Sequence, residues 1–330
     1  MRFAVVGAGG WGTAIARLLA MGGHDTVLWA RDAKLAASIA RDRRNAKYLP
    51  DVELPAENLC VTADLSQAVG QDALALAVPS FGMAELVERI VPLVETPPIV
   101  INLAKGIDRA SKRTMSEVIA HALPEANVFT LSGPSHAEEV GKDIPTAVVL
   151  AGRDVEVGGR LQREIATPRF RVYLSEDIRG VELCATVKNV IALATGISDG
   201  LGYGDNSRAA LITRGLAEMV RFARTFGVAE ATFFGLSGLG DLVATCTSRH
   251  SRNRYVGSRL GRGESLEDIL ADMDMVAEGV HATTVVHEIA CERGIEMPIT
   301  EAVVRLLNGE ADPLSLVEEI MTRAPKREGI

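Results

Sequence analysis

The 330-residue sequence predicts an α/β protein with a doubly wound, mainly parallel sheet, followed by an all-helical C-terminal domain. In the first half, short apolar runs alternate with longer segments of helical periodicity, which is typical of crossover units covering a parallel sheet on both faces. From Glu176 onward, helical periodicity continues almost throughout. Because no linker-like stretch separates the two patterns, we expect one domain over residues 1–178 and a second over residues 179–330.

The expected strands are short, mostly β-branched or rich in Leu and Ala, and most end in Gly, Pro, Ser or Lys. They cover residues 3–6, 26–29, 59–62, 74–78, 99–103, 128–131, 147–150 and 171–174. The expected helices of the first domain cover residues 11–21, 33–42, 83–91, 112–122 and 155–165. Those of the second domain cover residues 178–197, 207–226, 266–271, 281–293, 300–307 and 315–322.

The composition excludes several classes of partner. Hydrophobic residues make up 47% of the chain, as is ordinary for packed globular domains. The formal net charge of -8 argues against a nucleic-acid partner, since phosphate backbones recruit an excess of Lys and Arg. No apolar run reaches the ~18 residues of a membrane helix and no leader is visible, so we expect a cytoplasmic protein without an integral membrane segment.

Cysteine and histidine usage indicates neither a metal site nor a disulfide framework. The cysteines lie far apart without a Cys-x-x-Cys pair, and we expect each to be a small buried residue in a reducing compartment. The histidines form no metal-like pair on one helix face. These residues are Cys60, Cys184, Cys246, Cys291, His24, His121, His136, His250, His281 and His287.

A glycine-rich loop joins the first expected strand to the first expected helix. In the string Gly7-Ala8-Gly9-Gly10-Trp11-Gly12, the first glycine permits a tight turn and the second lets the backbone approach a pyrophosphate. The third, Gly12, allows the helix to pack closely on the strand. Since the helix N-terminus attracts negative charge, this context predicts a Rossmann-like dinucleotide-binding site.

The end of the second expected strand bears on the choice of dinucleotide. An acidic residue that grips the adenosine ribose is expected about twenty residues after the glycine loop. This sequence has Arg31 there, with Asp32 one place later. Arginine can pair with a 2′-phosphate, which favours NADPH over NADH, although Asp32 turning inward would serve NADH, and Arg31 could be only a solvated charge stacking on adenine.

Two lysines occupy positions that suit chemistry. Lys105 follows an apolar run, at the strand end that faces the ligand crevice in a doubly wound sheet, although a surface loop lysine is the alternative. Lys188 stands in a helix nearly free of charge after Glu182. Such a lysine either extends its amine to solvent or has its pKa lowered by desolvation. In the second case it could give a proton to a ketone during hydride transfer.

A cluster of arginines indicates an anion site in this acidic chain. Arginine binds phosphate oxygens through a fixed fork of donors, although most members of the cluster could be exposed surface charges. The cluster comprises Arg249, Arg252, Arg254, Arg259 and Arg262. Just before it, the tight turn Gly238-Leu239-Gly240-Asp241 could aim a carboxylate at a lysine or at substrate hydroxyls. Other glycines, at positions 196, 200, 202 and 204, are expected to break the chain between two helices.

Strings along nearly the whole chain resemble the bacterial NAD(P)-dependent glycerol-3-phosphate dehydrogenase family. The Lys-Asn, Gly-Asp-Leu and Ser-Arg-Asn segments are the most specific of them. The strings are GAGGWGTAIA from Gly7, LAVPS from Leu76, NLAKGI from Asn102, LSGPSHAEEV from Leu131, VKNVIALATGISDGLGYGDNSRAALITRG from Val187, GLSGLGDLVATCTSRHSRNRYVG from Gly235 and VAEGV from Val276.

The resemblance implies reversible reduction of dihydroxyacetone phosphate to sn-glycerol 3-phosphate for phospholipid synthesis, in a homodimer, with Lys188 as the proton donor and acceptor. It implies cofactor contacts from Gly7, Gly9, Trp11, Gly12, Arg31, Lys105, Ala137, Arg252, Val276 and Glu278. The implied substrate contacts are Lys105, Gly133, Ser135, Lys188, Asp241, Ser251, Arg252 and Asn253. No metal is implied. One departure is Gly10, where the family often has serine, so a hydroxyl contact to the pyrophosphate is missing.

Two rival functions predict different behaviour. A hydroxy-acid or sugar-acid dehydrogenase of the same architecture would prefer carboxylate substrates, and the Ser251-Arg252-Asn253 cluster counts against it. A nucleotide-sensing module without catalysis would tolerate the loss of Lys188 and Asp241, and the presence of both at family positions counts against that.

Overall fold

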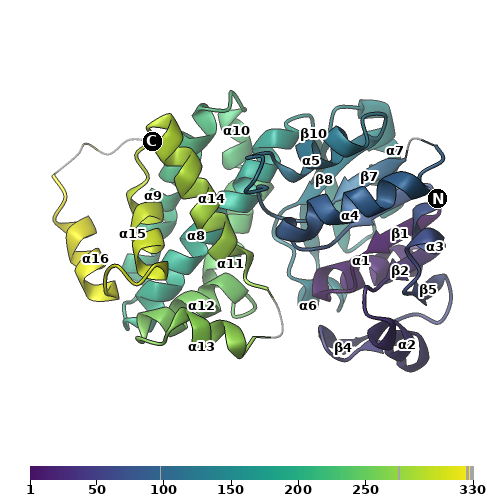
Figure 1. Ribbon diagram of the computed structural model, residues 1–330, viewed down its shortest axis with the longest axis horizontal. Coiled ribbons are helices and arrows are strands. Elements are labelled where there is room, and N and C mark those ends of the chain that lie inside the picture. Colours follow the sequence, from purple (N-terminus) through teal and green to yellow (C-terminus); the bar gives the residue numbers. More distant parts are fainter. Residues whose placement is uncertain (97, 274–275, 325–326, 328–330) are drawn as a thin grey trace. The chain divides into compact units, whose positions relative to one another are not determined.

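A computed structural model describes residues 1–96, 98–273, 276–324 and 327 (Figure 1). The chain divides into two compact units, Met1–Glu182 and Leu183–Ile330. The division falls inside helix α8 (Ile178–Gly200), so no loop connects the units.

Eight strands form the sheet of the first unit, in the order β5-β2-β1-β6-β7-β8-β9-β10. Neighbours pair in parallel except β8 and β9, which are antiparallel, so the last two strands run against the other six. The prediction of a mainly parallel sheet is therefore confirmed. The strands are β1 (Phe3–Val6), β2 (Thr26–Trp29), β5 (Leu59–Thr62), β6 (Ala73–Leu76), β7 (Ile99–Asn102), β8 (Asn127–Ser132), β9 (Thr146–Gly152) and β10 (Phe170–Ser175).

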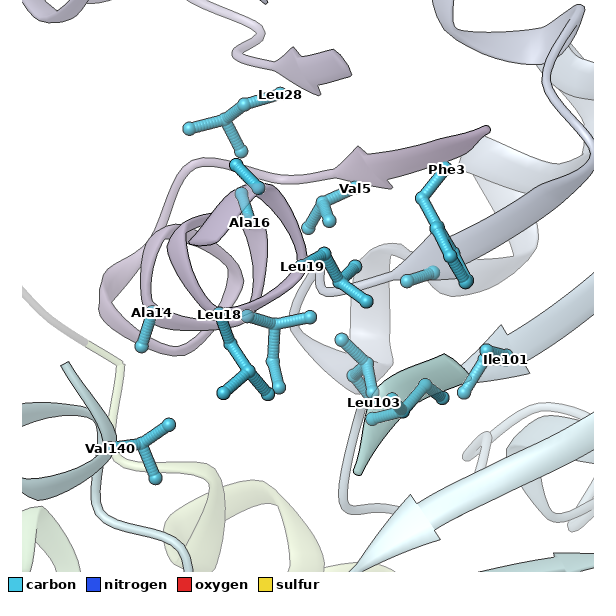
Figure 2. Packing of buried hydrophobic residues seen from close by; sticks show 14 of the residues in the cluster. Phe3, Val5, Ala14, Ala16, Leu18, Leu19, Leu28, Ile101, Leu103 and Val140 are labelled. Atoms are coloured by element: carbon cyan, nitrogen blue, oxygen red, sulfur yellow. The ribbon is translucent and has the colours of Figure 1, made fainter. Parts of the chain in front are cut away.

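Both faces of this sheet are buried, because apolar side chains alternate between two cores. In β1, Phe3 and Val5 belong to one core, whereas Ala4 and Val6 belong to the other. Figure 2 shows part of the first core, in which Leu19 of α1 lies on the side of the helix that faces Phe3 and Val5 of β1. Its helices are α1 (Gly10–Met21), α2 (Ala33–Asp42), α6 (Ala137–Val140) and α7 (Val155–Ile165), and those of the second core are α3 (Leu65–Val69), α4 (Met83–Ile90) and α5 (Met115–Ala122).

Several short elements of the first unit escaped the periodicity analysis. The two-stranded hairpin of β3 (Arg44–Asn45) and β4 (Leu49–Glu53) lies outside the main sheet. Its first strand carries Asn45, which is fully buried. The 3-10 turns η1 (Ser80–Gly82) and η2 (Val91–Leu93) flank α4.

The second unit is helical throughout its described residues, as predicted. Its elements after α8 are α9 (Asp205–Arg224), α10 (Glu230–Phe233), the π-helical turn η3 (Leu236–Gly240), α11 (Asp241–Thr247), α12 (Arg252–Gly261), α13 (Leu266–Ala271), α14 (Glu278–Arg293), α15 (Pro298–Leu307) and α16 (Pro313–Met321). The sequence analysis missed α10, α11 and α12, because each is short or rich in Gly and Arg.

Helix α8 is long and apolar enough to cross a membrane, contrary to the expectation that no segment would reach that length. Its apolar window has a mean hydropathy of 1.3, but the whole window is buried inside the protein. Burial on all sides is typical of a core helix, and α8 is the core helix of this fold.

Close contact between α8 and α12 explains four glycines, two of which the sequence analysis interpreted as helix breakers. Gly196 and Gly200 do not break the chain, as we expected, but lie within α8. A Cβ at Gly196 would overlap the carbonyl oxygen of Arg254, and one at Gly257 would overlap that of Leu193. Gly200 and Gly261 make equivalent contacts. The two helices therefore touch backbone to backbone, as in small-xxx-small helix pairs.

Two buried carboxylates stabilise the units internally. Glu182, in the first unit, accepts hydrogen bonds from Asn102, Ser116 and Thr130. Glu218 lies within α9 and caps the N-terminus of α15. Its carboxylate accepts hydrogen bonds from the amides of Ile299 (2.6 Å) and Thr300 (3.2 Å). Burial raises the pKa of Glu218 to about 7, despite these hydrogen bonds.

The cysteines divide between core and surface. Cys184 and Cys246 are buried, as expected, and burial raises the pKa of the Cys246 thiol to about 11. Cys60 and Cys291 are exposed, so the expectation that every cysteine would be buried was wrong.

Candidate active site

The glycine loop has the geometry that a dinucleotide requires. Gly7 has a φ of +123°, which favours glycine, and a Cβ there would lie 2.8 Å from the carbonyl oxygen of Ala77. A Cβ at Gly12 would overlap the carbonyl oxygen of Gly7, so α1 begins in contact with the turn. A Cβ at Gly9, in contrast, would meet no protein atom within 4 Å. The second glycine thus leaves the backbone open on the side from which a pyrophosphate would approach.

Neighbouring side chains fix the loop and leave one donor for a ligand. Asn45 donates to the carbonyl oxygen of Ala8 (2.9 Å) and to Thr13 Oγ1 (2.8 Å), which ties the hairpin to the loop. The buried indole N–H of Trp11 has no hydrogen-bond partner among the described residues. A buried donor without a partner is costly, so this N–H and the open backbone at Gly9 fit a bound nucleotide.

Gly10 also packs closely. A Cβ there would lie 3.0 Å from the carbonyl oxygen of Tyr48 and 3.6 Å from Ala137 Cβ. The serine that the family often carries at this position would press on the hairpin loop in this chain. The absence of a hydroxyl at Gly10 therefore agrees with the local packing.

Two charged residues that follow β2, Arg31 and Asp32, differ in their contacts. Asp32 caps α2, and its Oδ1 accepts from the amides of Lys34 (2.8 Å) and Leu35 (3.4 Å). Arg31 is exposed and has no hydrogen-bond or ion-pair partner among the described residues. The carboxylate is thus engaged locally, while the guanidinium is available to a ligand.

Three further predicted residues meet beyond the ends of β7 and β8. Lys105 Nζ donates to the carbonyl oxygen of Gly133 at 3.2 Å, and Ser135 Oγ donates to the same oxygen at 2.9 Å. Gly133 has a φ of +137° and follows β8 directly. The preceding Ser132 has a buried hydroxyl without a partner among the described residues. This corner therefore presents the Lys105 cation near a buried hydroxyl that has no partner among the described residues.

In the second unit, Lys188 does not extend to solvent. Its side chain is 4% exposed, and Nζ lies 3.1 Å from Asp241 Oδ1. Nζ also donates to Thr245 Oγ1 at 2.6 Å, and that hydroxyl donates to the carbonyl oxygen of Asp241 at 2.6 Å. The turn η3 delivers Asp241 as the first residue of α11, so the carboxylate meets a lysine, one of the two possibilities raised by its sequence.

The Ser251-Arg252-Asn253 segment lies at the start of α12, and the side chains of Ser251 and Asn253 hold it in place. Ser251 Oγ caps the helix by accepting from the amide of Arg254 at 3.2 Å. Asn253 Nδ2 donates to Asn189 Oδ1 at 2.9 Å, and Asn253 Oδ1 accepts from the amide of Gly279 at 2.9 Å. Arg252 itself is exposed and has no partner among the described residues.

Two more predicted cofactor residues, Val276 and Glu278, lie just before Gly279 in the sequence. Val276 is half-buried, and Glu278 begins α14 directly before Gly279. The Asn253 contact to Gly279 therefore anchors the start of α14 to α12.

Two of the remaining arginines of the cluster form ion pairs within the protein. Arg254 Nε pairs with Asp199 at 2.6 Å, and Arg259 pairs with Glu264 and Asp272. Arg254 and Arg259 are thus engaged within the protein, and Arg252 is the member of the cluster that stands at a helix N-terminus.

Sequence reasoning missed Thr245, Asn189, Glu182 and Asn45. Thr245 carried a detectable signal, because it lies four residues after Asp241 and so shares its helix face. The partners of Asn45 and Glu182 lie tens of residues away, and the sequence gives no local signal for such contacts.

A doubly wound sheet whose glycine loop opens α1, followed by a helical unit with a buried lysine, is typical of nicotinamide-dependent oxidoreductases. Two family models match the chain: the NAD-dependent glycerol-3-phosphate dehydrogenase N-terminus over residues 2–157, and the corresponding C-terminus over residues 177–318. The chain belongs to this glycerol-3-phosphate dehydrogenase family.

Individual relatives agree over the full length. The NAD(P)+-dependent glycerol-3-phosphate dehydrogenase of Chlorobium limicola is 48% identical over 99% of both chains, and that of Geobacter metallireducens is 47% identical over 99% of this chain and 98% of the relative. The crystal structure of glycerol-3-phosphate dehydrogenase from Coxiella burnetii is 40% identical, has a TM-score of 0.94, and covers 98% of this chain and 99% of that one.

Proposed function

We propose that this protein reduces dihydroxyacetone phosphate to sn-glycerol 3-phosphate, reversibly, with NADPH as the favoured cofactor. The observation that carries the proposal is the buried Lys188, held by Asp241 and Thr245. The product would supply the backbone of glycerophospholipids. Family membership supports the substrate, because the relatives above are glycerol-3-phosphate dehydrogenases.

Lys188 supplies the proton in this scheme. The nicotinamide, when bound, supplies the hydride that adds to the carbonyl carbon. The carbonyl π electrons move to oxygen, and Lys188 transfers one proton from its ammonium to the resulting alkoxide. In the oxidative direction the neutral amine takes the hydroxyl proton back. Asp241 and Thr245 hold Nζ in place, so the amine keeps one orientation although lysine side chains are flexible.

The other predicted substrate residues divide between the carbonyl and the phosphate. Lys105, with Gly133 and Ser135, would contact the carbonyl end and stabilise negative charge on its oxygen. Arg252 would bind the phosphate, supported by peptide N–H groups at the start of α12. Ser251 and Asn253 would hold that helix start, since their side chains already bond to neighbouring groups.

The cofactor would lie along the glycine loop. Gly7, Gly9 and Gly12 would admit the pyrophosphate and Trp11 would donate its free indole N–H. Further contacts are proposed from Lys105, Ala137, Arg252, Val276 and Glu278. We also propose a homodimer in the cytoplasm, as the family resemblance implies.

Cofactor preference rests on Arg31. Its guanidinium has no protein partner among the described residues, whereas Asp32 is engaged as the cap of α2. We expect Arg31→Gln to raise the KM for NADPH about 10- to 100-fold, the range of a lost charge-assisted contact, while the KM for NADH changes little. Steady-state kinetics with both cofactors measure this. Parallel rises in both KM values would contradict a 2′-phosphate contact.

The function is tested by cofactor oxidation with a panel of ketones. Purified protein is expected to oxidise NADPH with dihydroxyacetone phosphate, but not with pyruvate or unphosphorylated dihydroxyacetone. Running the same assay with NADH settles cofactor preference at the same time. Equal rates with the unphosphorylated ketone would contradict the proposed phosphate site. Turnover of pyruvate would favour a hydroxy-acid dehydrogenase.

A further inference from the structure

A second buried carboxylate, that of Glu182, lies in the first unit near the beginning of α8. The residue is 2% exposed. Its Oε1 accepts from Asn102 Nδ2 (2.9 Å) and Thr130 Oγ1 (2.8 Å). Both oxygens are also bonded to Ser116, through its amide (2.9 Å) and its hydroxyl (2.6 Å). The donors are uncharged, and burial raises the pKa of Glu182 despite them.

Each of these donors belongs to a different element. Asn102 is the last residue of β7, Thr130 lies in β8, and Ser116 lies in the first turn of α5. One carboxylate therefore joins two neighbouring strands and a helix start to α8. Because a buried charge is costly unless its hydrogen bonds are all made, this arrangement tolerates little displacement of any of the three elements.

The two strands lead directly into the corner that carries Lys105. Asn102 Oδ1 accepts from the amide of Ala104 at 2.9 Å, and Asn102 Nδ2 donates to the carbonyl oxygen of Ala104 at 3.1 Å. This local ring fixes the turn that ends at Lys105. On the second strand, Gly133 follows Thr130 by three residues, and its carbonyl oxygen accepts from Lys105 Nζ at 3.2 Å. Glu182 thus fixes the ends of the two strands that lead to Lys105 and to Gly133.

We propose that Glu182 is a positioning residue for the reaction, acting through Lys105 and Gly133 without touching substrate. The proposal rests on the proposed function, in which Lys105 stabilises charge on the carbonyl oxygen. Displacing this amine by about 1 Å is enough to cost on the order of 100-fold in rate. A purely structural carboxylate would instead affect stability alone.

Glu218 offers a matched control for that distinction. It is also 2% exposed, and it accepts from the amides of Ile299 and Thr300 and from the Thr300 hydroxyl, but it caps α15 in the second unit. None of these residues is assigned to the reaction. Loss of either carboxylate is expected to lower stability, and only loss of Glu182 is expected to lower catalytic efficiency.

The experiment compares Glu182→Ala, Glu182→Gln and Glu218→Ala in the intact protein, assayed well below each melting temperature. We expect Glu182→Ala to lower kcat/KM for dihydroxyacetone phosphate about 100-fold. Glu182→Gln should retain most activity, because an amide oxygen at the Oε1 position still accepts from the same donors. Equal kcat/KM values for Glu182→Ala and Glu218→Ala would overturn the proposal.

A double-mutant cycle with Lys105→Met tests the route of the effect. If Glu182 acts through Lys105, the double variant should lose no more activity than the worse single variant. Losses that multiply would overturn the proposal. Should Glu182→Ala fail to fold, Thr130→Val removes one donor and takes its place in the cycle. A wild-type protein inactive on dihydroxyacetone phosphate would refute the proposed function, whereas an active one with multiplying losses would refute only the role of Glu182.

Discussion

Lys188→Met is expected to lower turnover of dihydroxyacetone phosphate about 1000-fold, within the range for a general acid, while NADPH binding stays near that of the wild type. Methionine keeps most of the stem of the side chain but cannot hold or release a proton. Steady-state kinetics give the loss in kcat, and fluorescence titration of NADPH gives the affinity. A near-normal kcat in this variant would show that Lys188 is not the proton donor.

The same substitution leaves Asp241 buried without its cation, which typically costs about 3–5 kcal/mol of stability. The double variant Lys188→Met/Asp241→Asn removes both charges and is expected to recover much of this loss, as urea unfolding would show. Its activity should nevertheless stay as low as that of the single variant. Recovery of activity together with stability would mean that the lysine is needed for charge balance and not for chemistry.

Gly257→Ala is expected to reduce the free energy of unfolding by about 3 kcal/mol, at the upper end of the usual cost of overpacking. The added methyl would overlap the Leu193 carbonyl oxygen of α8, and a backbone atom cannot rotate away as a side chain can. Because Arg252 stands on the same helix, kcat/KM for the phosphorylated ketone should fall as well. Urea denaturation and steady-state kinetics measure the two effects.

Gly159→Ala is the matched control for this prediction. Gly159 lies within α7, and a Cβ there would meet nothing closer than 3.7 Å. Alanine at such a site usually stabilises a helix, by about 0.5 kcal/mol or more. If Gly257→Ala were as stable as Gly159→Ala, the close contact between α8 and α12 would be contradicted.

Most of the sheet and its helices could be predicted from the sequence, because buried strands and amphipathic helices carry local periodicity. The glycine loop was predictable for the same reason, since strand, turn and helix follow one another along the chain. The reversed direction of β9 and β10 was not predictable, because the connection over residues 133–145 is long enough for either direction and apolar content does not distinguish them.

The site was less accessible to sequence reasoning. Residues alone left Lys188 undecided between solvent and core, and its burial depends on Asp241 and Thr245 from a helix that is distant in sequence. Glycine spacing within a helix was mistaken for a break, because the packing partner of Gly196 lies on α12 and leaves no mark on the local pattern. Glu182 was noticed only as a charge, since its donors come from three separate elements.

The glycine contact of α8 with α12 also bears on substrate choice. In the proposed reaction, one helix carries the proton donor and the other the phosphate-binding arginine, and each is a rigid body. Where two backbones touch, the separation of those groups cannot stretch as it would across flexible loops. Under the proposed roles of Lys188 and Arg252, this fixed separation would favour ketones whose carbonyl and phosphate are spaced as they are in dihydroxyacetone phosphate.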